Sequence, residues 1–463
     1  MRDLASRLRA IVQQDVKGRR APFSNGSDED DARRHLTSVP DLDRTAAALG
    51  GNRHDVSDSA CVVIDRMWDA DRLHGRRRVG SYAIDSAAPL LLFDPRLAAI
   101  DDWASRVVFF DIETTGLSGG AGTLAFLAGC GWFERDGFKV RQFFLNGPAG
   151  EHAMLDALGR IFDDASLLVT FNGRTFDVPV METRWAYHRR ENPTADLPHF
   201  DMLPPARRLW KRPGDGGRLP KGSPLGDGGC LPKGTSVPLD TCSLSSLERS
   251  VLGFHRLDDV PGFEIPARYF QFLRTGDATV IEGVLEHNRH DLVSLAGVMA
   301  HALRLAAEGP EACETPTEQI GLGRLYERAG DSSRALHAYG LAAASDTRDV
   351  AAQALARLAV LLRREERHEE SAAAWQGVLA LASADHLDLT VLERRAAEAL
   401  AIHHEHRARD LAAAKGYAKT LRAQATGRLA AEIDHRLGRL DRKMKGSEHT
   451  TSGPKTARLL DGT

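Results

Sequence analysis

Four acidic residues in three short motifs constrain this chain more than any other feature of its sequence. Asp111 and Glu113 lie in Phe110-Asp-Ile-Glu-Thr-Thr-Gly116, Asp177 closes Asn172-Gly-Arg-Thr-Phe-Asp177, and Asp291 closes His287-Asn-Arg-His-Asp291. Carboxylates repel one another, so a fold that gathers them in one pocket needs cations between them. Two ions such as Mg²⁺, about 3.5–4 Å apart, can activate water and stabilise the leaving oxygen of a phosphodiester. The motifs therefore predict a pocket for two divalent ions, Mg²⁺ or Mn²⁺.

The length and composition favour a multidomain protein without a membrane-spanning segment. A chain of 463 residues is too long for one core, and 42% hydrophobic residues is ordinary for a globular protein. No apolar run approaches the ~18 residues needed to cross a bilayer. The N-terminus lacks the apolar core of a signal peptide and the five cysteines form no CxxC pair, so we expect a reduced, cytoplasmic protein. A formal net charge of −3 excludes a strongly basic nucleic-acid coater but not a nuclease, because metals and local basic patches can supply positive field.

Local patterns predict an α/β domain over residues 86–307, preceded by a poorly ordered region over residues 1–85. The first 85 residues are mixed in charge and poor in periodic apolar pattern. In the domain, short apolar runs predict buried strands at 107–110 and 167–171, and a hairpin from the runs 124–133 and 139–145. Helical spacing covers 151–162, 176–190, 243–252, 267–273 and 278–307. We expect a mixed sheet flanked by helices.

The same patterns predict where the acids lie. Alternation along a strand puts Asp111 and Glu113 on one face. Asp177 opens a helix after a neighbouring strand, although capping that helix is its ordinary role. His287 and Asp291 are four residues apart on one helix and share a face, where His287 can accept a proton near neutral pH. An exposed His–Asp pair is the alternative for these two residues.

Four further residues are candidates for binding substrate, each with a structural alternative. Thr114 and Gly116 either shape their turn or offer a backbone NH to the substrate terminus. Asn172 either bonds a nucleotide or caps its own turn, and Arg174 either holds a phosphate or is solvated. Asp201, which precedes two prolines, is expected to cap a helix, and indirect support of the site is the alternative.

Outside the acidic motifs the chain predicts an insertion, a helical region and a tail. Residues 213–241 are rich in Gly and Pro and nearly repeat themselves, so we expect a surface loop. Residues 313–445 are rich in Ala, Leu, Arg and Glu, and Tyr339, Trp375 and Tyr417 recur in a pattern that resembles tetratricopeptide repeats. Such an all-α repeat domain suggests a protein partner. Residues 446–463 are expected to form a tail.

Taken together, the motifs resemble the DEDD superfamily of ribonuclease H-like exonucleases, and more narrowly the YprB-type ribonuclease H-like proteins of bacteria. The similarity spans roughly residues 92–303. It implies that Asp111, Glu113, Asp177 and Asp291 bind two divalent ions and that the chain hydrolyses a nucleic-acid 3′ end. The superfamily usually places a His five residues, or a Tyr four residues, before the last Asp. Here those positions hold Glu286 and His287, which leaves the proton acceptor open.

The sequence thus favours a 3′→5′ exonuclease acting on single-stranded DNA or RNA, without contact with a membrane. The main alternative is a binding scaffold whose nuclease pocket is weak or silent and whose repeats recruit a partner. A phosphodiesterase for small nucleotides is a third possibility. The altered spacing of the proton acceptor favours the scaffold, whereas retention of all four acids favours the nuclease.

Overall fold

The computed structural model describes residues 39–84, 86, 88–99, 106–116, 122–211, 242–381 and 391–451. The chain divides into two units. The first comprises residues 1–207 and 213–307, and the second residues 208–212 and 308–463. Each unit is described by itself below.

A mixed β-sheet forms the centre of the first unit. Its described strands are β1 (Asn52–Val56), β2 (Ser59–Asp69), β5 (Val107–Thr114), β6 (Ala125–Glu134), β7 (Gly137–Phe144), β8 (Leu167–Thr170) and β9 (His199–Asp201). They follow one another across the sheet in the order β1-β2-β7-β6-β5-β8-β9. The β5–β8 and β8–β9 pairs are parallel and the others are antiparallel. A short ribbon, β3 (Leu73–His74) with β4 (Arg77–Arg78), lies apart from the sheet. The mixed sheet predicted from the sequence is confirmed.

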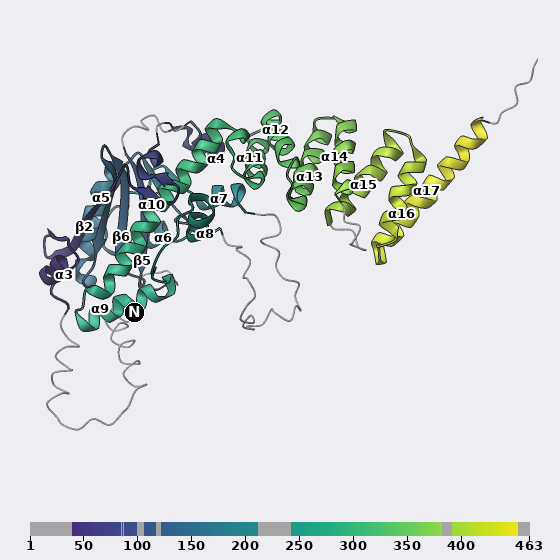
Figure 1. Ribbon diagram of the computed structural model, residues 1–463. Coiled ribbons are helices and arrows are strands. Elements are labelled where there is room, and N and C mark those ends of the chain that lie inside the picture. The colour runs from purple at the N-terminus through teal and green to yellow at the C-terminus, as the bar shows by residue number, and fades with distance from the viewer. Residues whose placement is uncertain are drawn as a thin grey trace, which may run out of the picture. The chain divides into compact units, whose positions relative to one another are not determined.

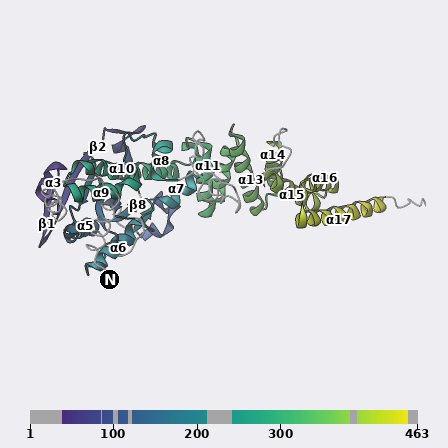
Figure 2. The same cartoon turned by 90° about the horizontal axis from the view of Figure 1, so that it is seen from below.

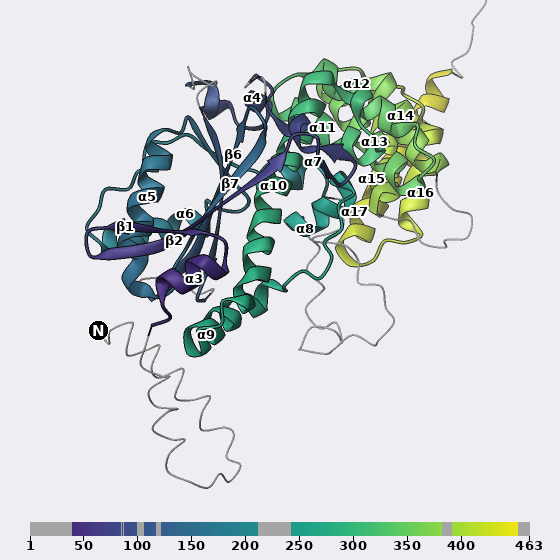
Figure 3. The same ribbon diagram turned by 60° about the vertical axis from the view of Figure 1, so that its left-hand side comes forward.

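Helices cover both faces of this sheet (Figure 1). The described helices of the unit are α3 (Leu42–Ala48), α4 (Leu90–Phe93), α5 (Glu151–Asp163), α6 (Asp177–Tyr187), α7 (Leu203–Leu209, whose last residues belong to the second unit), α8 (Leu244–Leu247), α9 (Ile265–Thr275) and α10 (Thr279–Glu308). Phe110 of β5 packs edge-on against Phe162 of α5, with ring centroids 5.2 Å apart. The next residue, Asp111, points the other way and is bonded by Asn288 of α10. Strand alternation therefore places α5 and α10 on opposite sides of the sheet, as Figure 3 shows.

The prediction that residues 1–85 are poorly ordered is wrong for residues 39–84. Strand β2 pairs with β7 along eight positions from Val62–Phe144 to Asp69–Gly137. Cys61, Val62 and Ile64 of β2 are fully buried in the core. The charged residues that obscured the strand in the sequence have cross-strand partners, since Asp65 accepts hydrogen bonds from Arg141 at 2.7 and 2.6 Å.

Helices in contact with their chain neighbours build the second unit, which confirms the predicted all-α region. They are α11 (Pro316–Arg328), α12 (Ser332–Ala343), α13 (Arg348–Arg364), α14 (His368–Ala380), α15 (Val391–His406), α16 (Leu411–Arg422) and α17 (Gly427–Thr451). Figures 1 and 2 show them in chain order along the unit. Tyr339 and Trp375 are buried on α12 and α14. A Cβ on Gly323 of α11 would meet the ring of Tyr339, so a small residue permits the close helix crossing.

Two boundaries and the type of one helix differ from the sequence prediction. Arg208–Arg212 joins the second unit, where Trp210 Nε1 donates to Glu318 Oε1 at 3.0 Å. Helix α17 continues to Thr451, into the predicted tail. The helix predicted over 243–252 is α8 followed by a π-helical turn, Glu248–Leu252. The Gly/Pro-rich insertion lies outside the described residues.

Among the helices that the structure describes, none combines the length and apolarity that a membrane span requires.

Candidate metal centre

Three neighbouring residues on adjacent strands position the candidate metal centre. Asp111 of β5 lies opposite Gly129 of β6, which in turn lies opposite Gln142 of β7. All three face α10. Gln142 Nε2 donates to Asn288 Oδ1 at 2.8 Å, and Asn288 Nδ2 donates to Asp111 Oδ2 at 2.8 Å. The buried Asn288 amide thus fixes α10 against β5 and orients the first acid.

Gly129 is needed for this close approach. A Cβ at this position would lie 2.9 Å from both Asn288 Cγ and Leu292 Cδ1, and closer still to Asn288 Oδ1. Any larger residue would push the helix away from the sheet. Because Gly129 has no side chain, α10 can lie close enough to the sheet for its residues to contact those on β5.

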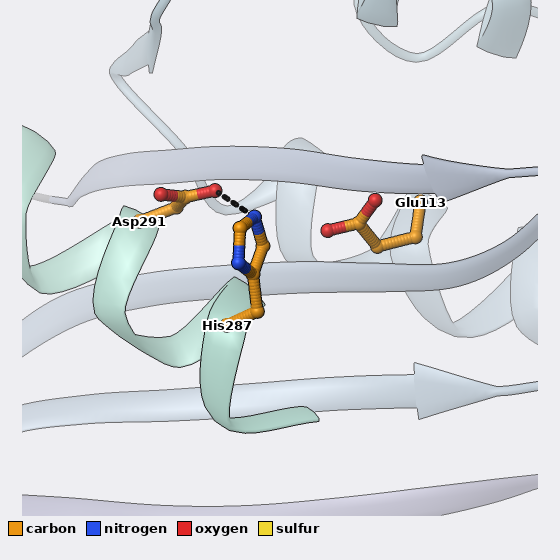
Figure 4. A group of neighbouring side chains, drawn as sticks. All are labelled: Glu113, His287 and Asp291. Atoms are coloured by element: carbon orange, nitrogen blue, oxygen red, sulfur yellow. Dashed lines mark ion pairs between the residues drawn. The ribbon is translucent and has the colours of Figure 1, made fainter. Parts of the chain in front are cut away.

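Glu113, His287 and Asp291 meet next to these three strand residues. One potential ligand atom from each lies within 4.8 Å of the others. Figure 4 shows the carboxylate of Glu113 extending from β5 toward the His287 ring and Asp291 on α10. His287 Nε2 lies 3.4 Å from Asp291 Oδ2, and its Nδ1 lies 2.8 Å from Asp259 Oδ1. The carboxylate of Asp259 favours a proton on Nδ1, which leaves the Nε2 lone pair toward the acids.

The loop after β8 brings in the third acid. Asp177 begins α6 and is 5% exposed. Asp201 of β9 holds this loop, because its carboxylate accepts backbone hydrogen bonds from Asn172 at 2.8 Å and Arg174 at 3.2 Å. It also accepts one from Leu203 at 3.0 Å, at the start of α7, so the expected capping role is part of what it does. Its hydrogen bonds to the 172–177 loop agree with the alternative expectation, that Asp201 supports the site indirectly.

The pKa values of Asp111, Glu113 and Asp177 are raised, and the charges of neighbouring acids contribute to each shift. Burial, reinforced by Asp291, Asp177 and Glu113, holds the pKa of Asp111 well above its usual value. Burial, again reinforced by Asp291 and Asp177, does the same to the pKa of Glu113. Burial raises the pKa of Asp177 to about 7, against the effect of backbone hydrogen bonds from Asp177 and Ile112. Deprotonating such a cluster at neutral pH requires a positive charge among the acids.

The predicted substrate residues lie around this centre with structural partners of their own. Thr114 Oγ1 donates to Gly116 O at 2.9 Å and shapes the turn after β5. Asn172 has a φ of 70° and its Oδ1 accepts a hydrogen bond from Thr175 at 2.8 Å, which fits capping of its own turn. Arg174 is not simply solvated: it donates to His199 O and lies 3.3 Å from Asp94.

Besides Asn288, a second residue in direct contact with the acids was not predicted. Arg256, in the loop after the π-helical turn, donates to Asp291 Oδ1 and forms a two-pronged pair with Glu248 at 2.9 and 2.5 Å. Its side chain is 6% exposed. The sequence gives no local signal for this contact, because Arg256 and Asp291 lie 35 positions apart.

Two comparisons with known proteins agree with this geometry. Residues 108–303 match the protein family described as the RNase_H superfamily. The first unit has an RNase H-like fold. The chain is also 30% identical over 273 residues to a Bacillus subtilis (strain 168) protein named "Uncharacterized protein YprB". That alignment covers 59% of this chain and 60% of the relative. The RNase H match suggests a nuclease.

The donor set fits a hard divalent cation. Carboxylate oxygens with one imidazole suit Mg²⁺ or Mn²⁺ better than soft metals, which prefer thiolates. Cys61 and Cys130 are buried in the core, and burial raises the pKa of both thiols. The raised pKa values of Asp111, Glu113 and Asp177 are a second indication, since a bound cation would remove the repulsion that causes part of each shift.

Proposed function

We propose that the first unit is a metal-dependent nuclease that hydrolyses phosphodiester bonds, and that it acts as a 3′→5′ exonuclease on single-stranded nucleic acid. The single observation that carries the proposal is the meeting of Glu113 from β5 with His287 and Asp291 from α10, next to Asp111, which Asn288 of α10 bonds. The charge of Asp177, at the start of α6, contributes to the raised pKa values of Asp111 and Glu113. Acids from three separate segments of the chain, with raised pKa values at Asp111, Glu113 and Asp177, fit a cation site better than solvation or capping.

The four acids would hold two divalent ions, Mg²⁺ or Mn²⁺. When bound, such ions supply Lewis-acid activation of water and charge stabilisation at the leaving oxygen. Asp111 is held in place by Asn288, and Asp177 by the loop that Asp201 organises. These partners fix the directions of the ligand oxygens before any ion binds, and such outer contacts orient metal ligands generally.

His287 would accept the proton of the attacking water. With its Nδ1 proton directed to Asp259, the Nε2 lone pair lies on the side of Glu113 and Asp291. The imidazole sits one helical turn before Asp291, so its distance from the acids is set by the geometry of α10 rather than by a loop. The carboxylate of Asp259 would stabilise the imidazolium that forms.

The proposal is tested on oligonucleotides labelled at the 5′ or the 3′ end, as DNA and as RNA, with Mg²⁺ or Mn²⁺. We expect release of nucleotides from the 3′ end and a loss of more than ~100-fold in Asp111→Ala, which exceeds the loss typical of an outer-shell partner. The control is Asp71→Ala, which removes an acid whose side chain is 94% exposed. Equal cleavage by wild type and Asp111→Ala would refute the assignment.

A second candidate function is a nucleic-acid or protein scaffold with a silent pocket. The contact of Arg256 with Asp291 favours the scaffold, because a positively charged side chain already pairs with one of the proposed metal ligands. Nucleic-acid binding that neither Mg²⁺ nor Mn²⁺ converts into cleavage would support this candidate. In either case we propose that the helical second unit, with its resemblance to tetratricopeptide repeats, recruits a protein partner.

A further inference from the structure

Arg256 stands out because three carboxylates and an imidazole surround its guanidinium. It bonds Glu248 through two nitrogens, lies 3.3 Å from Asp259 Oδ2, and donates to Asp291 Oδ1. Its Nη1 is also 3.3 Å from His287 Nδ1. The residue therefore contacts both an acid of the candidate metal centre and the group expected to orient His287.

The guanidinium is a permanent positive charge. An arginine does not lose its proton in a protein, so Arg256 cannot leave the centre by becoming neutral. A divalent ion at Asp291 and the guanidinium would use the same carboxylate and would repel each other. One of them must give way for the other to bind fully.

Glu248 can still pair with Arg256 when Asp291 binds a metal ion. The Glu248 side chain is 2% exposed, and both its oxygens accept hydrogen bonds from Arg256 in a fork-to-fork pair. Glu248 is fixed at the start of the π-helical turn Glu248–Leu252. If Asp291 turns to a metal ion, Arg256 keeps this partner and Asp259 and is not left as an unpaired buried charge.

We propose that Arg256 is a built-in competitor of the divalent ion for Asp291, and that Glu248 sets the strength of the competition by holding Arg256. The inference rests on the proposed binding of metal by the acids. In the metal-free chain Arg256 offsets the repulsion among the acids, and metal binding exchanges one cation for another at Asp291. Arg256 is thus a positioning residue that tunes the affinity for the ion.

The competition predicts opposite effects of two substitutions on metal affinity. In Arg256→Gln, Asp291 loses its competitor, and we expect Mn²⁺ to bind about tenfold more tightly. In Glu248→Gln, Arg256 loses its charged partner and is drawn to Asp291, and we expect Mn²⁺ to bind about tenfold more weakly. Isothermal titration of the full chain with Mn²⁺ measures both, and Mn²⁺-dependent melting shifts, each relative to the same variant in EDTA, provide a second readout.

A purely structural role would give a different result. Loss of a buried ion pair would lower the metal-free melting temperature of both variants without moving their Mn²⁺ affinities in opposite directions. Arg184→Gln is the matched control, because it breaks the equally buried Arg184–Glu151 pair of the same unit. It should lower stability and leave Mn²⁺ affinity unchanged. If Arg256→Gln does not fold, weaker binding by Glu248→Gln still supports the competition, and unchanged binding overturns it.

Asp111→Ala separates this inference from the proposed function. If Asp111→Ala leaves Mn²⁺ affinity unchanged in both the wild-type and the Arg256→Gln backgrounds, the metal centre itself is wrong. If Asp111→Ala abolishes binding but Arg256→Gln binds no more tightly than wild type, the centre stands and only the competition is wrong.

Discussion

At the scale of single residues, Asp177 illustrates why this pocket depends on cations. Burial raises its pKa to about 7, and Asp201 and Asp291 add to the shift. A carboxyl whose pKa is higher in the folded than in the unfolded state binds its proton more tightly when folded. As pH rises from the unfolded value of about 4 toward 7, ionisation of this group therefore costs stability.

The pH dependence of Asp177→Asn isolates this effect. In EDTA we expect the variant to gain stability relative to wild type, on the order of 1–2 kcal/mol, between pH 5 and pH 7. With Mg²⁺ the order reverses, because the ion needs the carboxylate that asparagine lacks. Urea unfolding at each pH, with and without Mg²⁺, measures the difference between the two proteins.

The stability of wild type must be compared with that of Asp177→Asn, because buried histidines change the stability with pH in the opposite direction. Burial lowers the pKa of His199 and of His290 to about 4, so their contribution to stability rises with pH in the same window. These histidines are present in both proteins and cancel in the difference. A difference that stays constant from pH 5 to pH 7 would contradict the raised pKa of Asp177.

The candidate acids could be predicted from the sequence, but Arg256 could not. Each acid stands in a motif at the end of a strand or on a helix face, where spacing alone indicates its direction. Arg256 lies in a loop without periodicity and meets Asp291 from 35 positions away. Its place depends on the π-helical turn before it, and no local pattern distinguishes that turn from an ordinary helix. Asn288 was hidden for a similar reason, since its partners lie on two different strands.

At the scale of elements, the crossing of α10 over the sheet determines the geometry of the centre. The crossing depends on the empty position at Gly129, opposite Asp111 and beneath Asn288. We expect Gly129→Ala to destabilise the unit by about 1–3 kcal/mol through overpacking. It should also weaken Mn²⁺ binding, because displacing Asn288 releases Asp111. Urea unfolding and Mn²⁺ titration report the two effects.

Gly159 provides the matched control for this substitution. It lies within α5, and a Cβ there would meet nothing within 4 Å. Since alanine is the better helix former, Gly159→Ala should stabilise the unit by up to about 1 kcal/mol and leave metal affinity unchanged. If the two alanine variants behaved alike, the proposed role of Gly129 in admitting α10 would be wrong.

Strands with apolar runs were predictable, whereas β2 was not. The run from Val107 to Phe110 predicted β5, and the runs 124–133 and 139–145 predicted the β6–β7 hairpin. In β2 the charged residues Asp65 and Arg66 interrupt the apolar residues and suggest a solvated segment. Their role becomes visible only with the strand partner, because Asp65 lies opposite Arg141. Cross-strand pairs are properties of the sheet, not of either strand.

At the scale of the whole molecule, the change in composition along the chain lies close to the division between the two units. The change to Ala-rich helical sequence after residue 313 coincides with the start of α11 at Pro316. The exchange of Arg208–Arg212 to the second unit was not predictable, because it depends on contacts such as that of Trp210 with Glu318. A short segment whose contacts lie more than a hundred positions away carries no local sign of its unit.

The N-terminal strands give the last prediction. A chain that starts at residue 86, the boundary predicted from sequence, would lose β1 and β2. Strand β7 would then expose a row of unpaired NH and C=O groups, and the core would lose Cys61, Val62 and Ile64. An exposed, apolar sheet edge promotes association between chains.

We therefore expect residues 86–463 to aggregate, or to unfold at a much lower urea concentration than residues 39–463, which keep all the described strands. Gel filtration and urea unfolding of the two fragments, with the full chain as reference, measure the difference. Equal solubility and stability of both fragments would show that β2 is dispensable and that the domain begins where the sequence first suggested.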